Sequence, residues 1–203
     1  MKLFSRPGAC STALHATLHW TPLAFEVQLV QRSPDSEAAL RAVHPGGAVP
    51  VLVDGDFVLT QHLAITAYLA DRAPDAGVLG DNTPRARAEA LRWLAVTTTD
   101  VRPTFGPFFA PSMYVADARS VEDLQATARA RVHQQFALLD QRLQSRHYLA
   151  GARSAADAHV YVMLRWAAMF DIDLSDLEAL AAFKSRMARD PGVAAALAAE
   201  GLH

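Results

Sequence analysis

The pattern of the chain changes once, across residues 73–82, and this change constrains the fold more than any other feature of the sequence. Before it, short stretches of alternating apolar residues are interleaved with stretches of helical spacing; after it, only helical spacing is found. Pro74, Gly77 and Gly80 fall within the change and are typical of a linker. The sequence therefore predicts a small α/β domain followed by an all-α helical bundle.

The first part of the chain predicts the order strand, helix, strand, helix, hairpin, helix. Phe25, Val27 and Leu29 alternate with polar residues, as in a half-buried strand. Residues 54–56, Asp-Gly-Asp, separate two apolar runs and are typical of a hairpin turn. The predicted strands cover residues 2–5, 25–29, 49–53 and 57–59, and the predicted helices cover 9–20, 35–43 and 61–72. This order predicts a mixed sheet with helices packed on it.

The rest of the chain predicts a bundle. Helical spacing extends over residues 84–109, 120–145, 154–170 and 175–188, with a short helix after Pro191. Helices of this length can bury one another. Ser154 and Asp157 fit a capping box at the start of one of them, so we assign this pair to folding and not to chemistry.

The composition excludes several classes of function. The 203 residues carry a formal net charge of −2, so there is no basic field to attract nucleic acid. No apolar run reaches the roughly 18 residues that span a bilayer, and the opening stretch is too soon broken for a signal peptide. The single cysteine cannot form an internal disulfide. We expect a cytoplasmic protein with no metal and no nucleic-acid or membrane partner.

Cys10 is the first candidate for chemistry. It stands between a predicted strand and the start of a predicted helix, in the run Pro-Gly-Ala-Cys-Ser that ends at Ser11. Backbone N–H groups and the positive end of the helix dipole stabilise an anion at such a place, so the thiol is expected to be partly ionised near neutral pH. The alternative is a small buried apolar residue, and position alone does not decide between the two.

Two further junctions are candidates for binding. Val49-Pro50 opens a predicted strand, and a cis bond there would expose the Val49 backbone to a peptide-like ligand. The alternative is a trans proline on an edge strand. Gln61 and His62 start a predicted helix whose backbone donors are suited to a carboxylate. The alternative there is a helix cap with solvated side chains.

Short runs of residues in a fixed order along the whole chain carry a resemblance to a known family. They are Met1-Lys2-Leu3-Phe4, then Pro7-Gly8-Ala9-Cys10-Ser11 with Ala13 and His15, Val49-Pro50, Leu59-Thr60, Ala64-Ile65, Tyr68-Leu69-Ala70-Asp71, Ala156-Asp157-Ala158, Val162, Leu164-Arg165-Trp166-Ala167 and Ala199-Glu200-Gly201-Leu202. Each run is weak by itself, but together they resemble the beta class of bacterial glutathione transferases.

The resemblance implies a thioredoxin-like glutathione-binding domain over residues 1–76, a linker over 77–82 and an all-helical domain over 83–203. It also implies a homodimer, with glutathione on the first domain and an electrophile in an apolar cleft between the two. The residue matching Cys10 faces the glutathione sulfur and forms a mixed disulfide with it. Those matching Val49 and cis Pro50 pair with the cysteinyl part. Those matching Gln61 and His62 hold the γ-glutamyl end, and the one matching Asp100 reaches its amine from the partner subunit.

Several positions depart from the family pattern. Ser5 replaces a tyrosine, and Gln61-His62 replaces a glutamate followed by a small residue. Because glutamine lacks the charge that pairs with the γ-glutamyl amine, glutathione binding is expected to weaken by about 1–2 kcal/mol. A histidine–lysine pair becomes Arg102-Pro103, which keeps a cation but removes a titrating base near pH 7. Arg32 is the nearest match to a lysine on the loop after the second strand.

Two classes of function follow from the resemblance. The first is an enzyme in which glutathione, held as thiolate near Cys10, Ser11 and Arg102, is conjugated to a small hydrophobic electrophile. The expected pocket residues are Phe105, Phe108, Met113 and Trp166, although aromatic residues at helical spacing are more often core. A variant of this class is thiol–disulfide or peroxidase chemistry through Cys10. The second class is a weakly catalytic or non-catalytic binding protein on the same scaffold.

Overall fold

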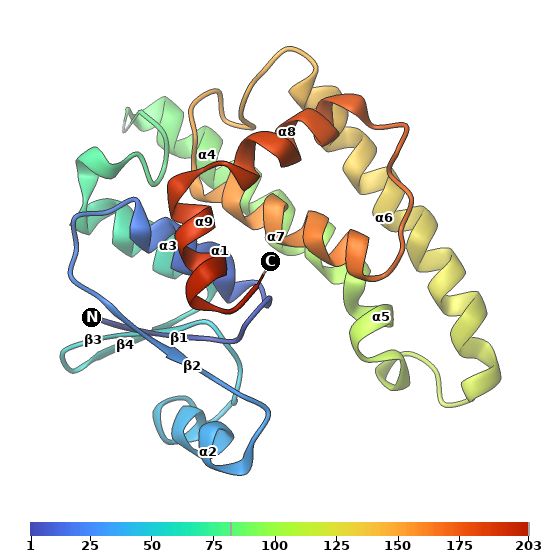
Figure 1. The fold of residues 1–203 in the computed structure, drawn as a ribbon, viewed down its shortest axis with the longest axis horizontal. Helices are drawn as coiled ribbons and strands as arrows, with labels where there is room; N and C mark the ends of the chain where they lie inside the picture. The colour runs from blue at the N-terminus through green and yellow to red at the C-terminus, as the bar shows by residue number, and fades with distance from the viewer. Residues whose placement is uncertain (82, 203) are drawn as a thin grey trace.

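A four-stranded sheet and a bundle of helices form the two parts of the fold (Figure 1). The computed structural model describes residues 1–81 and 83–202. The strands are β1 (Lys2–Ser5), β2 (Glu26–Leu29), β3 (Val51–Asp54) and β4 (Phe57–Thr60), in the sheet order β2-β1-β3-β4. β1 runs parallel to β2 and antiparallel to β3, so the predicted mixed sheet of a thioredoxin-like domain is confirmed.

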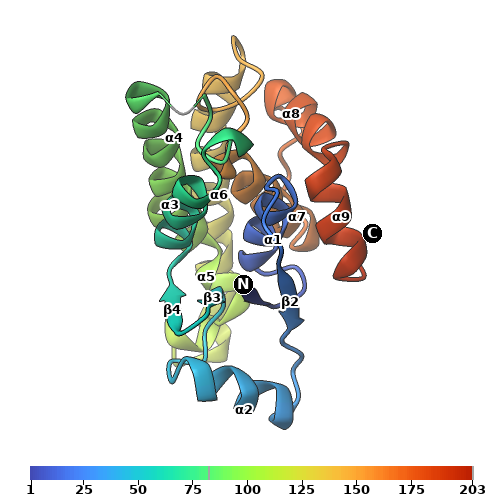
Figure 2. The same cartoon turned by 90° about the vertical axis from the view of Figure 1, so that its left-hand side faces the viewer.

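Helices cover both faces of this sheet, because its central strands are apolar on both sides. Leu3 of β1 faces a core shared with α1 (Ser11–His19) and α3 (His62–Arg72). Phe4, the next residue, faces the opposite core with Leu40 of α2 (Pro34–Val43). Figure 2 shows α2 on the side of the sheet away from α1 and α3. The period of two along a strand thus builds two cores from one short sequence.

The bundle is arranged around α7 (Ala155–Met169), whose residues are buried along nearly its whole length. A helix that is apolar on every side belongs in the centre of a bundle. The Ser154–Asp157 capping box predicted at its start is present. The other long helices of the bundle are α4 (Pro84–Val96), α6 (Val121–Leu143), α8 (Glu178–Ala188) and α9 (Pro191–Ala199). None of the described helices is long and apolar enough to cross a membrane.

The helix predicted over residues 84–109 is wrong as a single element. α4 ends at Val96, and the chain continues as a π-helical turn η2 (Thr97–Val101), a 3₁₀ turn η3 (Arg102–Phe105) and the short α5 (Gly106–Phe109). Pro103 has no N–H to donate and its ring would clash with the carbonyl four residues earlier. The hydroxyls of Thr97 and Thr98 also bond back to the Leu94 carbonyl. The helix register is therefore reset just before the last aromatic residues.

α1 joins the two domains. It packs against α7 and α9, and Cys10, Ala13 and Ala16 belong to the core of the helical domain. Gly192 permits the close approach of α9, since a Cβ there would lie 2.8 Å from the Ala16 carbonyl oxygen. The first helix of the sheet domain is thus held mainly by the other domain.

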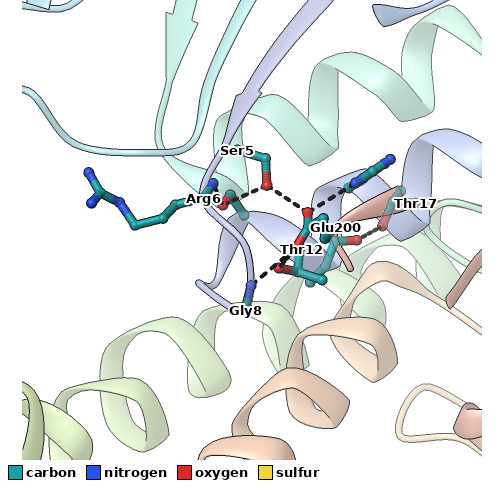
Figure 3. Close-up of polar contacts among 9 residues, drawn as sticks. Ser5, Arg6, Gly8, Thr12, Thr17 and Glu200 are labelled. Carbon is teal, nitrogen blue, oxygen red and sulfur yellow. Dashed lines mark hydrogen bonds and ion pairs between the residues drawn. The ribbon is translucent and has the colours of Figure 1, made fainter. Parts of the chain in front are cut away.

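A buried carboxylate fixes this junction (Figure 3). The Glu200 side chain, which follows α9, accepts hydrogen bonds from the hydroxyls of Ser5 and Thr12 at 2.9 and 2.6 Å and from the Gly8 N–H at 3.1 Å. Its Oε1 is also 3.0 Å from His15 Nδ1. Burial raises the pKa of Glu200, but these bonds outweigh it and hold the pKa below its usual value. One side chain near the end of the chain therefore secures β1, the following loop and α1.

Glu200→Gln is expected to lower the free energy of unfolding by about 3–5 kcal/mol, because the charge that several buried donors share is lost. Urea denaturation at pH 7 measures the change. Glu178→Gln, in the exposed first turn of α8, is the matched control and is expected to cost less than about 0.5 kcal/mol. Equal midpoints for the two variants would contradict this assignment of Glu200.

Candidate functional site

A cavity of about 790 Å³ lies between the two domains. It is bounded by the loop before α1, by the start of β3, by η3 and α5, and by the end of α7. Its lining residues are Arg6, Pro7, Gly8, Ala9, Cys10, Arg32, Val49, Arg102, Pro103, Gly106, Phe109, Ala110, Met113, Tyr114, Arg165, Trp166, Met169 and Leu202. Of the residues predicted from the sequence, it brings together Cys10, Arg32, Val49, Arg102, Met113 and Trp166.

The loop that carries Cys10 is anchored to the helical domain at one peptide unit. Gly8 has a φ of +73°, which a glycine adopts without strain. Its N–H donates to Glu200, and its carbonyl accepts a 2.7 Å hydrogen bond from the Trp166 indole. Because both sides of this residue are tied to the other domain, the loop has a fixed position at the cavity.

Cys10 occupies the N-cap position of α1 and is 8% exposed. It lines the cavity at the N-terminus of α1, where the positive end of the helix dipole favours an anion. Ser11, predicted beside it as a catalytic donor, is placed differently. Its buried hydroxyl accepts from the Arg6 N–H at 3.1 Å and contacts the Ser5 hydroxyl at 3.0 Å. The Ser11 side chain thus belongs to the Glu200 network, through Ser5.

The Val49–Pro50 peptide bond is cis, as the family resemblance implied. Val49 lines the cavity, and Pro50 is buried behind it at the start of β3. The backbone before β3 therefore forms part of the cavity wall opposite the helical domain.

Gln61 and His62 lie beside each other but face different surroundings. Gln61 is exposed with a φ of +72°, and neither residue lines the cavity. The His62 ring is 6% exposed and packs on His159 of α7, with ring centroids 4.4 Å apart. Burial, and after it the Arg102 guanidinium, lowers the pKa of His62 to about 3. His62 is therefore neutral at physiological pH, and its ring belongs to the contact between the domains.

Asp100 and Arg102 lie on different surfaces although two positions apart. Arg102 lines the main cavity. Asp100 is exposed and lines a separate cavity of about 510 Å³ with Trp93, Leu138 and Arg142, on the α4–α6 side of the bundle. In one copy of the chain, Asp100 is therefore apart from the residues around Cys10.

The apolar wall of the cavity differs in part from the prediction. Trp166 and Met113 line it, but Phe105 is fully buried between Trp166 and Phe136, and Phe108 stacks on Phe170. Phe109 lines the cavity instead, together with Tyr114 and Met169, which the sequence analysis missed. The register shift between α4 and α5 decides which phenylalanine is exposed. Two adjacent phenylalanines gave no signal that could separate them.

Cations dominate the polar part of the cavity. Among the described residues that line it, every charged one is an arginine: Arg6, Arg32, Arg102 and Arg165. Arg6 also pairs with Glu37 at 2.6 Å. A thiol at a helix start, a backbone edge and several guanidinium groups suit an anionic, peptide-like ligand on one side, while the aromatic residues suit an apolar one on the other.

Comparison with known proteins decides the family. The profile of the glutathione S-transferase N-terminal domain matches residues 8–72, and that of the C-terminal domain matches residues 101–191. Glutathione S-transferase GST-4.5 of Xanthomonas campestris is 43% identical over the full length of both chains. This chain belongs to the glutathione S-transferase family. It is a transferase by family, and its relatives favour the enzyme over the non-catalytic alternative.

Further relatives agree with this placement. Glutathione S-transferase GstA of Escherichia coli O157:H7 is 36% identical to this chain over the full length of both. The structure of a glutathione S-transferase from Xylella fastidiosa superposes with a TM-score of 0.92 at 42% identity, over 100% of this chain and 99% of that one. A sphingomonad glutathione S-transferase complexed with glutathione has a TM-score of 0.86 at 36% identity, over 100% of both chains. Neighbours of the bacterial beta class are among these structures, as the resemblance implied.

The neutral His62 makes the transferase sensitive to acid. Its pKa lies near 3 in the folded chain and at 6.5 in the unfolded one, so between these values the unfolded state binds a proton that the folded state does not. His62 therefore lowers the free energy of unfolding as pH falls from 6.5, by up to about 1.4 kcal/mol per pH unit. His62→Asn is expected to lose less stability than the wild type between pH 6.5 and pH 4.

Urea denaturation at several pH values measures this slope, and comparing the two chains cancels the other titrating groups. His147→Asn, at an exposed histidine, is the control and should follow the wild type. A His62→Asn curve parallel to the wild type would show that His62 does not titrate as described.

Proposed function

We propose that this transferase conjugates glutathione to small apolar electrophiles in the cavity between its domains. The observation that carries the proposal is the shared cavity of Cys10 at the start of α1, the Val49 edge and the guanidinium groups of Arg32 and Arg102. These groups match the parts of glutathione: a thiol, a peptide backbone and carboxylates. The sphingomonad neighbour, which is complexed with glutathione, supports glutathione as the ligand.

In this proposal glutathione lies along the sheet domain. The Val49 backbone pairs with its cysteinyl part beside cis Pro50, and Arg32 binds its glycine carboxylate. The γ-glutamyl carboxylate binds the N–H groups at the start of α3, where Gln61 and His62 are placed. The His62 side chain does not take part, since its ring faces His159.

The reacting sulfur then lies near Cys10. The N–H groups that open α1 and the Arg102 charge stabilise the glutathione thiolate, which lowers the cost of losing its proton to water. The thiolate attacks an electrophilic carbon held against Trp166, Phe109 and Met113. The sulfur–carbon bond forms as the leaving group departs with its electron pair. A guanidinium is a poor base, so Arg102 acts in this proposal as a fixed positive charge.

Cys10 supports a second reaction at the same place. Its thiolate can attack oxidised glutathione, which forms a Cys10–glutathione disulfide and releases one glutathione thiolate. This thiol–disulfide exchange needs no group beyond Cys10 and the glutathione site. It is the activity that a conjugating site alone would not have.

The full site is proposed to need two copies of the chain. Asp100 of one subunit reaches the γ-glutamyl amine of the glutathione that is bound to the other subunit. Asp100 lies on the face that carries the exposed Leu138. An apolar side chain that is 55% exposed beside a charged cavity suits an interface. The proposed setting is a cytoplasmic homodimer.

The wild-type protein is expected to be retained on immobilised glutathione and to conjugate 1-chloro-2,4-dinitrobenzene. Gln61→Glu restores the charge that pairs with the γ-glutamyl amine, so its Kd for glutathione should fall roughly 5- to 30-fold, equal to about 1–2 kcal/mol. Calorimetry with glutathione measures the Kd. Gln144→Glu, at an exposed residue following α6, is the charge-matched control. No binding and no turnover at millimolar glutathione would refute the proposed function.

Incubation with oxidised glutathione is expected to add one glutathione to the protein, detected by intact-mass measurement, and Cys10→Ala should abolish the adduct. Conjugation by Cys10→Ala is measured in parallel. If turnover survives, the α1 N–H groups and Arg102 activate the glutathione thiol without Cys10. An unmodified wild-type protein would show that the thiol is inaccessible and would exclude the exchange reaction.

A further inference from the structure

The contact between α3 and α7 contains a buried polar cluster. Among the described residues, the buried side-chain nitrogen and oxygen atoms without a hydrogen-bond partner are Nδ1 and Nε2 of His62, Oγ1 of Thr66 and Nε2 of His159. His62 and Thr66 are one turn apart on α3, and the His159 ring lies on that of His62. We call these residues, with Thr97, the interdomain histidine cluster. A buried polar atom without a partner costs about 1–3 kcal/mol, so their concentration at one contact points to a role for it.

The hydrogen bonds of Thr97 determine which ring nitrogen of His159 carries the proton. Thr97 Oγ1 donates its hydrogen to the Leu94 carbonyl at 2.9 Å, so its 2.9 Å contact with His159 Nδ1 requires that nitrogen to be the donor. Burial, with the charges of His62 and Arg102 after it, lowers the pKa of His159 far below its usual value. His159 is therefore neutral, with its proton on Nδ1 and a lone pair on Nε2.

The His62 ring carries a hydrogen-bond donor that could bond to this lone pair of His159. A neutral imidazole has one N–H, and no ring nitrogen of His62 has a partner within the described chain. The two rings are inclined at 55° with centroids 4.4 Å apart, and they are not hydrogen-bonded to each other. Since an N–H lies in the plane of its ring, a bond from His62 to His159 Nε2 requires one ring both to rotate and to move outward. That bond would complete a path from His62 through His159 and Thr97 to the Leu94 carbonyl.

The two ends of this path carry residues of the proposed site. His62 directly follows Gln61 at the start of α3, where the γ-glutamyl end of glutathione is placed. Thr97 opens the π-helical turn η2, which contains Asp100 and leads into Arg102. The Arg102 charge lowers the pKa of both histidines, which places its guanidinium within electrostatic reach of each. The cluster therefore connects the glutathione side of the cavity to the side that carries Arg102.

We propose that His62 and His159 are positioning residues, and that glutathione binding closes the hydrogen bond between their rings. This path of hydrogen bonds, which we call the relay, sets the spacing between the start of α3 and the η2–η3 segment. Glutathione on one side of the cavity therefore orders the residues on the other side. The inference rests on the proposed glutathione site and adds a coupling between its two halves. Neither histidine lines the cavity, so any effect on glutathione acts through these contacts.

The kinetic test uses variants outside the cavity. His159→Phe and Thr97→Val, the second nearly isosteric, are expected to raise KM for glutathione about 3- to 10-fold and to leave KM for 1-chloro-2,4-dinitrobenzene within about twofold. His159→Gln keeps a donor for Thr97 and an acceptor for His62, so it should restore glutathione binding. Val160→Ala, at a buried apolar neighbour on α7, is the control for lost packing and should lower stability without raising KM.

Nitrogen-15 NMR of histidine-labelled protein provides the spectroscopic test. His159 is expected as the Nδ1–H tautomer, and S-methylglutathione should shift its Nε2 resonance upfield and slow exchange of a His62 ring proton. An Nε2–H tautomer, or ring resonances that do not respond to the ligand, would overturn the relay. So would an unchanged glutathione KM in Thr97→Val, even if His159→Phe does not fold. Absence of glutathione binding in the wild type would instead refute the proposed function.

Discussion

The buried Glu200 carboxylate is the interaction on which the position of the site depends. It bonds to the end of β1, to the Gly8 peptide and to the first turns of α1, and so fixes three segments at once. Burying an unpaired carboxylate at that depth would cost free energy of folding. The side chains of Ser5 and Thr12 are short, so their hydroxyls bond to the carboxylate without crowding α1. Cys10 has its place at the cavity because the residues on both sides of it are held in this way.

The same junction accounts for the shape of the cavity. α1 supplies Cys10 from the sheet domain, and Cys10, Ala13 and Ala16 belong to the core of the helical domain. The Trp166 indole, which forms part of the apolar wall, also holds the Gly8 carbonyl. The Cys10 thiol and the apolar wall are therefore placed by shared contacts, and the spacing between them does not depend on the linker.

Much of the fold could be predicted from the sequence, because strand alternation, helical spacing and turn residues are local signals. The cis bond before Pro50 followed only from the family resemblance, whereas the capping box at Ser154 is such a local signal, since it is specified within a few residues. Cys10 was found for the same reason, as its run joins a strand to a helix start. The break between α4 and α5 was not, because the consequence of Pro103 depends on how the threonine hydroxyls before it bond. The exposure of Phe109 in the cavity depends on that break.

The side-chain contacts between domains were not predictable, because they join residues far apart in the sequence. Ser11 is next to Cys10, yet its hydroxyl is used in the Glu200 network and not in the cavity. His62 is next to Gln61, yet its ring faces α7. A residue next to a functional one in the sequence lies at the same place along the backbone, but its side chain can have different surroundings. The roles of individual residues therefore remain predictions, and so do the domain bounds.

The anchoring of Gly8 has a consequence for how such chains can diverge. The loop with Cys10 belongs to the sheet domain, but its geometry is enforced by α7 and by Glu200, which follows α9. A hybrid gene that joined this sheet domain to the helical half of a distant relative would keep the cysteine and lose the partners that hold its loop. The two halves are therefore expected to be inherited as a unit, with variation confined to the open rim of the cavity.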